Sequence, residues 1–359
     1  MKNWLKTKTL AALFGCAMFN FLFVGCKDPE PVNPTPVDPE KAGANGVYVL
    51  CEGLWQMNNA TLAFYDFTAG ELTADAFLAV NGRGLGDTGS DLQIYGGKMY
   101  CVVNISETVE VMSRDARSLK QIPLSGKQPR KVAFYQDFAY VSCYDGDVVK
   151  IDTATLSVVG TCTAGSNPDG LCVANGKLYV ANSGGLNYPN YGKTVSVIDL
   201  TNFSVVKNIS VVDNPTRIAA DKYGDVYLNS NGNYSDVASA FQRISSQTDE
   251  VVQTFGFSAT NLVISGDFAY LYDYDYATQQ SVVKVLNVFD ETIENENFIA
   301  DGTNIETPYA IAVNSVNGDV YIADAHDYST NGDVICFDAN GRKKFSFEVG
   351  INPMVVVIF

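Results

Sequence analysis

The sequence predicts an all-β protein, a seven-bladed β-propeller of four-stranded antiparallel blades, with the ring closed by the C-terminal strand completing the N-terminal blade. Three observations lead to this prediction. A short sequence motif that contains a tyrosine recurs seven times, and seven further positions each mark the start of a strand after a turn. The two ends of the repeat region each carry an incomplete set of strands. A repeat of about 40 to 50 residues with several short strands is typical of a propeller.

The recurring motif is a turn that contains Gly or Asp, followed by a tyrosine within a run of residues that favour β-strands, as in residues 175–180. Successive tyrosines are 39 to 52 residues apart. We expect these side chains to pack between blades rather than to contact a ligand, because they lie inside apolar segments. They are Tyr48, Tyr100, Tyr140, Tyr179, Tyr227, Tyr270 and Tyr321.

Residues 129–165 illustrate one unit of the repeat. Strands are expected at 131–134, 138–143, 148–152 and 157–161, with Gly, Asp, Asn and Thr in the connections, and four such strands make one blade. Proline suits the first residue of a strand, where no ladder donor is lost. The first strands open near Ser90, Pro129, Pro168, Pro215, Asn261, Pro308 and Pro353.

The two ends of the repeat region complement each other. The propeller begins at residue 45 with a second strand at 46–50, and third and fourth strands are expected around 60–66 and 72–80. The chain finishes with a first strand at 353–359 that nothing follows. Pairing these ends closes the ring and removes free sheet edges, and the strand count fits only seven blades.

The N-terminal segment predicts export and lipidation. Residues 1–25 combine a lysine-bearing start with an apolar run, as in a secretory signal peptide. The run ends in Phe23-Val24-Gly25-Cys26, which resembles a bacterial lipobox, so Cys26 is the expected lipidation site; a cleaved signal or an anchor without lipid is the alternative. Residues 26–44 are Pro-rich and acidic and are expected to form an extended tether. Acidic residues after the cysteine resemble the surface-export signal of Bacteroidetes lipoproteins, which implies an outer-membrane, cell-surface location.

Composition excludes several classes of function. The formal net charge of −16 argues against a nucleic-acid-binding protein, which needs a basic surface. The cysteines of the repeat region show no CxxC spacing and mostly lie in apolar runs, so we expect no metal site. His326 is the only histidine, which rules out a multi-histidine metal site or a pair of catalytic histidines. We therefore expect a binding protein rather than an enzyme, with no cofactor of its own.

The expected binding surface is the face on which first strands begin and second-to-third-strand loops return. These loops are rich in aromatic, amide and carboxylate side chains, which suit a large polar ligand, although Asn and Asp are also common turn residues. The ligand-binding candidates are Glu52, Trp55, Asn58, Asp87, Asn104, Tyr144, Asn182, Tyr188, Tyr191, Tyr234, Tyr274, Asp324, His326 and Tyr328.

Several segments resemble known families. Phrases such as Lys177-Leu178-Tyr179-Val180-Ala181-Asn182 are similar to those of YVTN-type propellers. Residues 51–62, 81–88 and 318–328, together with 349–353, resemble the cobalamin-binding surface propeller lipoproteins of gut Bacteroides, which cap the outer-membrane vitamin B12 transporter. Cys51 departs from this pattern, where an Asn is expected before Glu52-Gly53.

The resemblance implies a monomeric surface lipoprotein that binds a corrinoid and delivers it to a TonB-dependent transporter. Two alternatives stay open. The propeller could bind another nutrient or a glycan, or it could be a structural or adhesion module with a protein partner.

Overall fold

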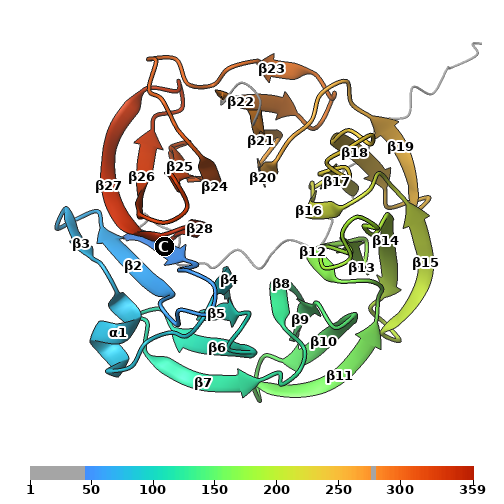
Figure 1. Ribbon diagram of the computed structural model, residues 1–359, viewed down its shortest axis with the longest axis horizontal. Coiled ribbons are helices and arrows are strands. Elements are labelled where there is room, and N and C mark those ends of the chain that lie inside the picture. The colour runs from blue at the N-terminus through green and yellow to red at the C-terminus, as the bar shows by residue number, and fades with distance from the viewer. Residues whose placement is uncertain (1–44, 276–279) are drawn as a thin grey trace, which may run out of the picture.

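Seven four-stranded sheets stand radially around a central axis in the computed structural model of the chain (Figure 1). The structure describes residues 45–275 and 280–359. The seven-bladed, all-β prediction is therefore confirmed, while the predicted signal peptide, Cys26 and the tether lie outside the described residues.

Each blade has the same antiparallel strand order from the axis outward. The first, innermost strands are β4 (Gly89–Tyr95), β8 (Pro129–Tyr135), β12 (Pro168–Ala174), β16 (Pro215–Ala220), β20 (Asn261–Ser265), β24 (Pro308–Val313) and β28 (Pro353–Ile358). The second strands are β1 (Gly46–Cys51), β5 (Lys98–Val103), β9 (Phe138–Cys143), β13 (Lys177–Asn182), β17 (Asp225–Ser230), β21 (Phe268–Asp275) and β25 (Val320–Asp324).

The outer half of each blade follows the same order. The third strands are β2 (Thr61–Asp66), β6 (Thr108–Ser113), β10 (Asp147–Asp152), β14 (Thr194–Asp199), β18 (Ala240–Ser245), β22 (Gln280–Asn287) and β26 (Asn331–Phe337). The fourth strands are β3 (Glu71–Thr73), β7 (Ser118–Pro123), β11 (Ser157–Thr163), β15 (Ser204–Ser210), β19 (Glu250–Thr254), β23 (Ile293–Asn295) and β27 (Lys343–Ile351).

The ring closes as the sequence predicts. Strand β28 pairs antiparallel with β1, with Val356 opposite Val49 and Val355 opposite Leu50. Beyond the strand, the backbone N–H of Phe359 donates to Gly46, and the N–H of Gly46 donates back to Phe359. The first blade is therefore built from both ends of the repeat region.

The repeated tyrosines lie at the interfaces between blades. Six of the seven are buried, and Tyr270 is half-buried. Some of their hydroxyl groups bond to the neighbouring blade: that of Tyr48 donates to the backbone carbonyl of Arg114 at 2.8 Å, and that of Tyr227 to the carbonyl of Val288 at 3.3 Å. The recurring tyrosine motif therefore serves the packing of neighbouring blades.

One element differs from the sequence prediction. The expected fourth strand at 72–80 is only the short β3, and the chain continues into a helix, α1 (Ala76–Asn81). The carboxylate of Asp75 caps the helix by accepting from the backbone N–H of Leu78, and Gly82 ends it with a left-handed φ of 67°. Phe77 is fully buried in the interface between the first two blades, which holds the helix in place.

The six cysteines of the propeller are free thiols, and all except the half-buried Cys162 are buried. They act as small apolar side chains within the strands. Among the described residues, no helix has the length and apolar character needed to cross a membrane.

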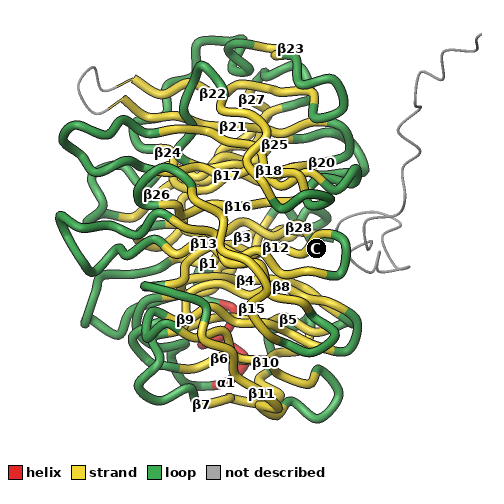
Figure 2. Tube along the Cα trace, turned by 90° about the vertical axis from the view of Figure 1, so that its right-hand side faces the viewer, coloured by secondary structure: helices red, strands yellow, loops and turns green. Residues whose placement is uncertain are grey.

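The propeller has two loop-covered faces, seen on the left and right of Figure 2. The C-terminal end of β28 lies on the right-hand face, so first strands end there and begin on the opposite face. We call the face on which the first strands begin the top face. It carries the loops that join second to third strands.

Candidate ligand-binding face

Large apolar side chains are exposed on the top-face loops. Trp55, on the β1–β2 loop, is 66 % exposed; Tyr188, on the β13–β14 loop, is 73 % exposed; and Tyr234, on the β17–β18 loop, is 68 % exposed. Met57 and Leu186 are exposed on two of the same loops. Clusters of exposed apolar side chains commonly mark interaction sites, which makes these loops the first candidate for ligand contact.

Three tyrosines on two neighbouring blades form one aromatic group. The ring centroid of Tyr191 lies 6.1 Å from that of Tyr188 and 5.9 Å from that of Tyr234, and both pairs meet edge to face. This packing joins the β13–β14 and β17–β18 loops and limits the rotamers of the exposed rings. An aromatic surface restrained in this way loses little conformational entropy when a ligand binds.

Two of the loop tyrosines have unusual backbone conformations. Tyr234 has a φ of 57° and Tyr328 a φ of 64°, within the left-handed region that bulky residues rarely adopt. Each such residue costs on the order of 1 kcal/mol. Leu156 and Phe203, in turns on the opposite face, share this conformation, so it belongs to tight turns on both faces of the propeller.

A pocket of tyrosines lies on the top face, mainly on the two blades formed by β20–β23 and β24–β27. It has a volume of about 110 Å³ and is lined by Tyr272, Tyr274, Tyr309 and Tyr328, with Arg217 at its inner end. The rings of Tyr309 and Tyr328 are 5.8 Å apart, and the hydroxyl of Tyr309 donates to the Glu52 carboxylate at 2.7 Å. The structure therefore brings three of the candidate residues, Glu52, Tyr274 and Tyr328, close to one another.

A charged group lies beside this pocket, at the start of the first strands. The guanidinium of Arg130 lies 3.7 Å from Asp169 and stacks over the ring of Tyr144 at 4.6 Å. The Tyr144 hydroxyl donates to Asp169 at 3.2 Å. Burial raises the pKa of Asp169, but Arg130, Arg217 and Lys131 outweigh burial and lower it overall, so the carboxylate is charged at neutral pH.

Four of the candidate residues, Asp87, Asn104, Asn182 and Asp324, are buried and hydrogen-bonded to other groups of the protein. Asn104 donates to the carbonyl of Pro129, and Asn182 donates to the hydroxyls of Thr194 and Ser196. Asp324 accepts from the backbone N–H groups of residues 306, 307 and 326. These side chains shape the loops from underneath.

His326 is half-buried among acidic side chains. Its Nε2 lies 3.1 Å from Asp333, and its Nδ1 lies 3.4 Å from Glu306 and 3.7 Å from Asp324. Burial alone would lower the pKa of the imidazole, but Asp324, Asp333 and Glu306 raise it overall. The imidazole is held by three carboxylates, an arrangement that suits a positively charged structural group.

Asp87 fixes the loop that presents Trp55. Its two carboxylate oxygens accept from the backbone N–H groups of Gln56 and Asn58, both at 3.1 Å, and Gln56 and Asn58 have φ of 62° and 51°. We expect Asp87→Asn to lower the free energy of unfolding by about 1–2 kcal/mol, because an amide offers one acceptor oxygen where the loop requires two. Chemical denaturation measures this loss.

An exposed acid supplies the control for this prediction. Asp290 lies in the β22–β23 turn on the opposite face, and Asp290→Asn should change stability by less than about 0.5 kcal/mol. Equal stabilities for Asp87→Asn and the wild type would contradict the assigned role of Asp87.

Sequence reasoning missed the residues closest to the axis. Arg130, Lys131, Asp169, Arg217 and Tyr309 were not among the candidates, although each directly follows, or lies two residues after, the proline that opens its first strand. A charged residue or Tyr in an otherwise apolar inner strand is the signal that could have found them. Among the described residues, no group of three or more His, Cys, Asp or Glu side chains is placed to hold a metal ion.

Comparison with protein families matches residues 45–355 to the family described as "Domain of unknown function (DUF5074)". The chain belongs to this family. The match spans the propeller almost completely, so the family and the fold describe the same part of the chain. A comparison with curated proteins finds no match.

Solved structures share the fold at low sequence identity. A quinonprotein alcohol dehydrogenase-like protein from Bacteroides thetaiotaomicron is 15 % identical, with a TM-score of 0.66 over 88 % of this chain and 78 % of the other. Hydrazine synthase from Kuenenia stuttgartiensis is 16 % identical, with a TM-score of 0.56 over 68 % of this chain and 74 % of the other.

The computationally designed Ika8 protein is 15 % identical, with a TM-score of 0.56 over 88 % of this chain and 96 % of the other. At such identities the likeness concerns the fold alone, because propellers carry many unrelated functions. The activity of this DUF5074 propeller has to be argued from its own surface.

Proposed function

We propose that this protein is a cell-surface binding module that captures a corrinoid, of the vitamin B12 class, on its top face and passes it to a TonB-dependent outer-membrane transporter. The observation that supports the proposal is the group of exposed aromatic side chains on the top-face loops, led by Trp55, Tyr188 and Tyr234. These loops belong to different blades, so a ligand that spans them must be broad.

The chemistry of a corrinoid suits such a surface. Its ring is wide and apolar, and amide side chains surround its edge. Aromatic side chains offer a large contact area to the apolar ring. The exposed Asn58, together with the Tyr309 hydroxyl and the Glu52 carboxylate, offers hydrogen bonds to the amides. The similarity of residues 51–62 and 318–328 to cobalamin-binding surface propellers supports the same ligand.

The proposal includes the route to the cell surface. Residues 1–25 would act as the export signal, Cys26 would carry the lipid, and the Pro-rich segment 26–44 would hold the propeller away from the membrane. The propeller would act as a monomer, because its closed ring leaves no sheet edge that requires a second copy. No catalytic step is assigned to it.

Isothermal titration calorimetry with cyanocobalamin tests the proposal. We expect one ligand per chain and a loss of affinity of about tenfold for each of Trp55→Ala, Tyr188→Ala and Tyr234→Ala, because a contact aromatic contributes on the order of 1–2 kcal/mol. The matched control is Phe289→Ala, which removes a 54 % exposed aromatic ring from the β22–β23 turn on the opposite face.

The outcomes separate the candidate functions. Binding that is weakened by the three top-face variants and unchanged in Phe289→Ala supports corrinoid capture on this face. No heat and no retention of the coloured ligand at micromolar protein would overturn it. Binding of oligosaccharides to the same residues would then identify the surface as a glycan-binding face.

A further inference from the structure

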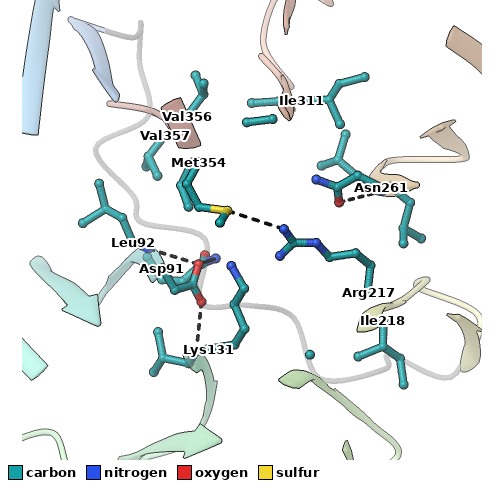
Figure 3. A pocket seen from close by; sticks show the side chains of 18 of the residues that line it. Asp91, Leu92, Lys131, Arg217, Ile218, Asn261, Ile311, Met354, Val356 and Val357 are labelled. Carbon is teal, nitrogen blue, oxygen red and sulfur yellow. Dashed lines mark hydrogen bonds between the residues drawn. The ribbon is translucent and has the colours of Figure 1, made fainter. Parts of the chain in front are cut away.

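The propeller axis contains a second cavity beneath the top face. Its volume is about 470 Å³, and the first strands of all seven blades contribute to its wall. Most of the lining residues are apolar, but Asp91, Lys131 and Arg217 bring charged groups into the cavity (Figure 3). Each of the three is the third residue of its first strand, which places it toward the top face. Arg217 and Met354 line both this cavity and the tyrosine pocket above it, so the two spaces adjoin.

Two cations in this cavity form no ion pair with any carboxylate of the described residues. The guanidinium of Arg217 extends toward Met354, and its Nη2 contacts the Sδ atom at 3.5 Å (Figure 3). Lys131 is 7 % exposed, and its ammonium donates to the backbone carbonyl of Ser90. A cation taken out of water normally has a carboxylate partner, because its desolvation is costly.

The carboxylates of Asp91 and Asp169, which also lie near the start of first strands, are bonded to donors other than Arg217 and Lys131. Asp91 accepts from the backbone N–H groups of Val132 at 2.9 Å and Leu92 at 3.0 Å. Asp169 is engaged by Arg130 and Tyr144, as described above. Within the described part of the chain, the guanidinium of Arg217 therefore faces the cavity without an acceptor oxygen, in a protein whose net charge is −16.

We propose that the axial cavity is a binding site for an oxyanion, a carboxylate or a phosphoryl group, held by the guanidinium of Arg217 and the ammonium of Lys131. A planar guanidinium presents parallel N–H groups that match two oxygens of such an anion, and the ammonium adds a second charge. The tyrosine pocket provides the way in from the top face. This site is distinct from the exposed aromatic surface and does not depend on corrinoid binding.

Binding of two small anions measures the site directly. Sulfate represents a tetrahedral phosphoryl-like group and malonate represents carboxylates, and both keep their charge between about pH 6.5 and 9. We expect one anion per chain in titration calorimetry, with a weakening of about tenfold or more in Arg217→Met and a smaller loss in Arg217→Lys. Preference for one probe identifies which of the two oxyanion classes the site takes.

A matched control and a pH series make the test specific. Arg117→Met removes the same charge from an exposed turn and should leave anion binding unchanged. Burial, together with Arg217 and Arg130, lowers the pKa of Lys131 to about 7 against the opposing effect of Asp91 and Asp169. Affinity should therefore fall as the pH rises from about 6.5 to 9, as the ammonium loses its proton.

Two results would overturn the proposal. One is the absence of binding for both anions at about 10 mM, the concentration at which even a weak site would be occupied. The other is binding that is equally strong in Arg217→Met, which would mean that the anion sits elsewhere on the surface. A melting curve with the wild-type cooperativity confirms that the variant is folded.

Discussion

A chain shortened to end at Asn352 will not form a stable propeller. The truncation removes β28, which pairs with β1 at five positions and contributes the buried Met354 and Val356 to the axis. It also removes Phe359, whose ring packs edge to face against Tyr48 and Phe64. We expect a loss of more than about 5 kcal/mol, which is comparable to the whole stability of many domains, and recovery of the protein as aggregates.

A circular permutant supplies the control for this prediction. Because Phe359 lies beside Gly46, a short linker can join residue 359 to residue 45, with the new ends at Pro353 and Asn352. This chain retains β28 and the same propeller residues, so it should fold and unfold in one cooperative transition. Circular dichroism melts compare the two forms. A truncated chain that melts like the wild type would show that ring closure is not required.

Blade number and closure could be predicted because they depend on repetition. Seven tyrosines and seven strand openers give the same count, and the unmatched strands at 46–50 and 353–359 define how the ends join. The helix α1 could not be predicted in the same way. Residues 76–80 are apolar enough for a strand, and only the Asp75 cap, the Gly82 end and the burial of Phe77 against its neighbours select a helix.

The candidate site was predicted less completely, for a different physical reason. Asn and Asp in a loop can point outward to a ligand or inward to the backbone, and the sequence does not distinguish the two directions. Asp87, Asn182 and Asp324 point inward to bonds with the protein, whereas the rings of Trp55 and Tyr188 are exposed to solvent. Lys131 and Arg217 lie within first strands, where side chains alternate between the two faces of the sheet. This alternation does not reveal from the sequence which side chains are directed toward the propeller axis.

The second large expected effect is a gain in stability from Lys131→Met, and the size of this gain depends on pH. Below about pH 7 the lysine is protonated in both the folded and the unfolded chain, and the folded chain bears the full cost of burying the charge. Above pH 7 the folded chain releases the proton while the unfolded chain keeps it. The cost then shrinks with rising pH and disappears near 10.5, the ordinary pKa of lysine.

The shift of the Lys131 pKa to about 7 corresponds to several kcal/mol at low pH, less the hydrogen bond to the carbonyl of Ser90. We therefore expect Lys131→Met to raise the free energy of unfolding by about 2–3 kcal/mol at pH 6 and by much less at pH 9. Urea denaturation at pH 6, 7.5 and about 9 measures the trend. Lys120→Met, at an exposed position of β7, is the control and should change stability by less than about 0.5 kcal/mol throughout.

A gain that fades with rising pH would mean that the propeller retains a destabilising cation at its axis. Proteins commonly give up stability in this way at sites that bind ligands, because the groups that bind a ligand are poorly satisfied without it. Added sulfate or malonate should then stabilise the wild type more than Lys131→Met, as an anion compensates the buried charge only where the charge is present. A variant that is less stable than the wild type at pH 6 would instead assign Lys131 a structural role through its bond to Ser90.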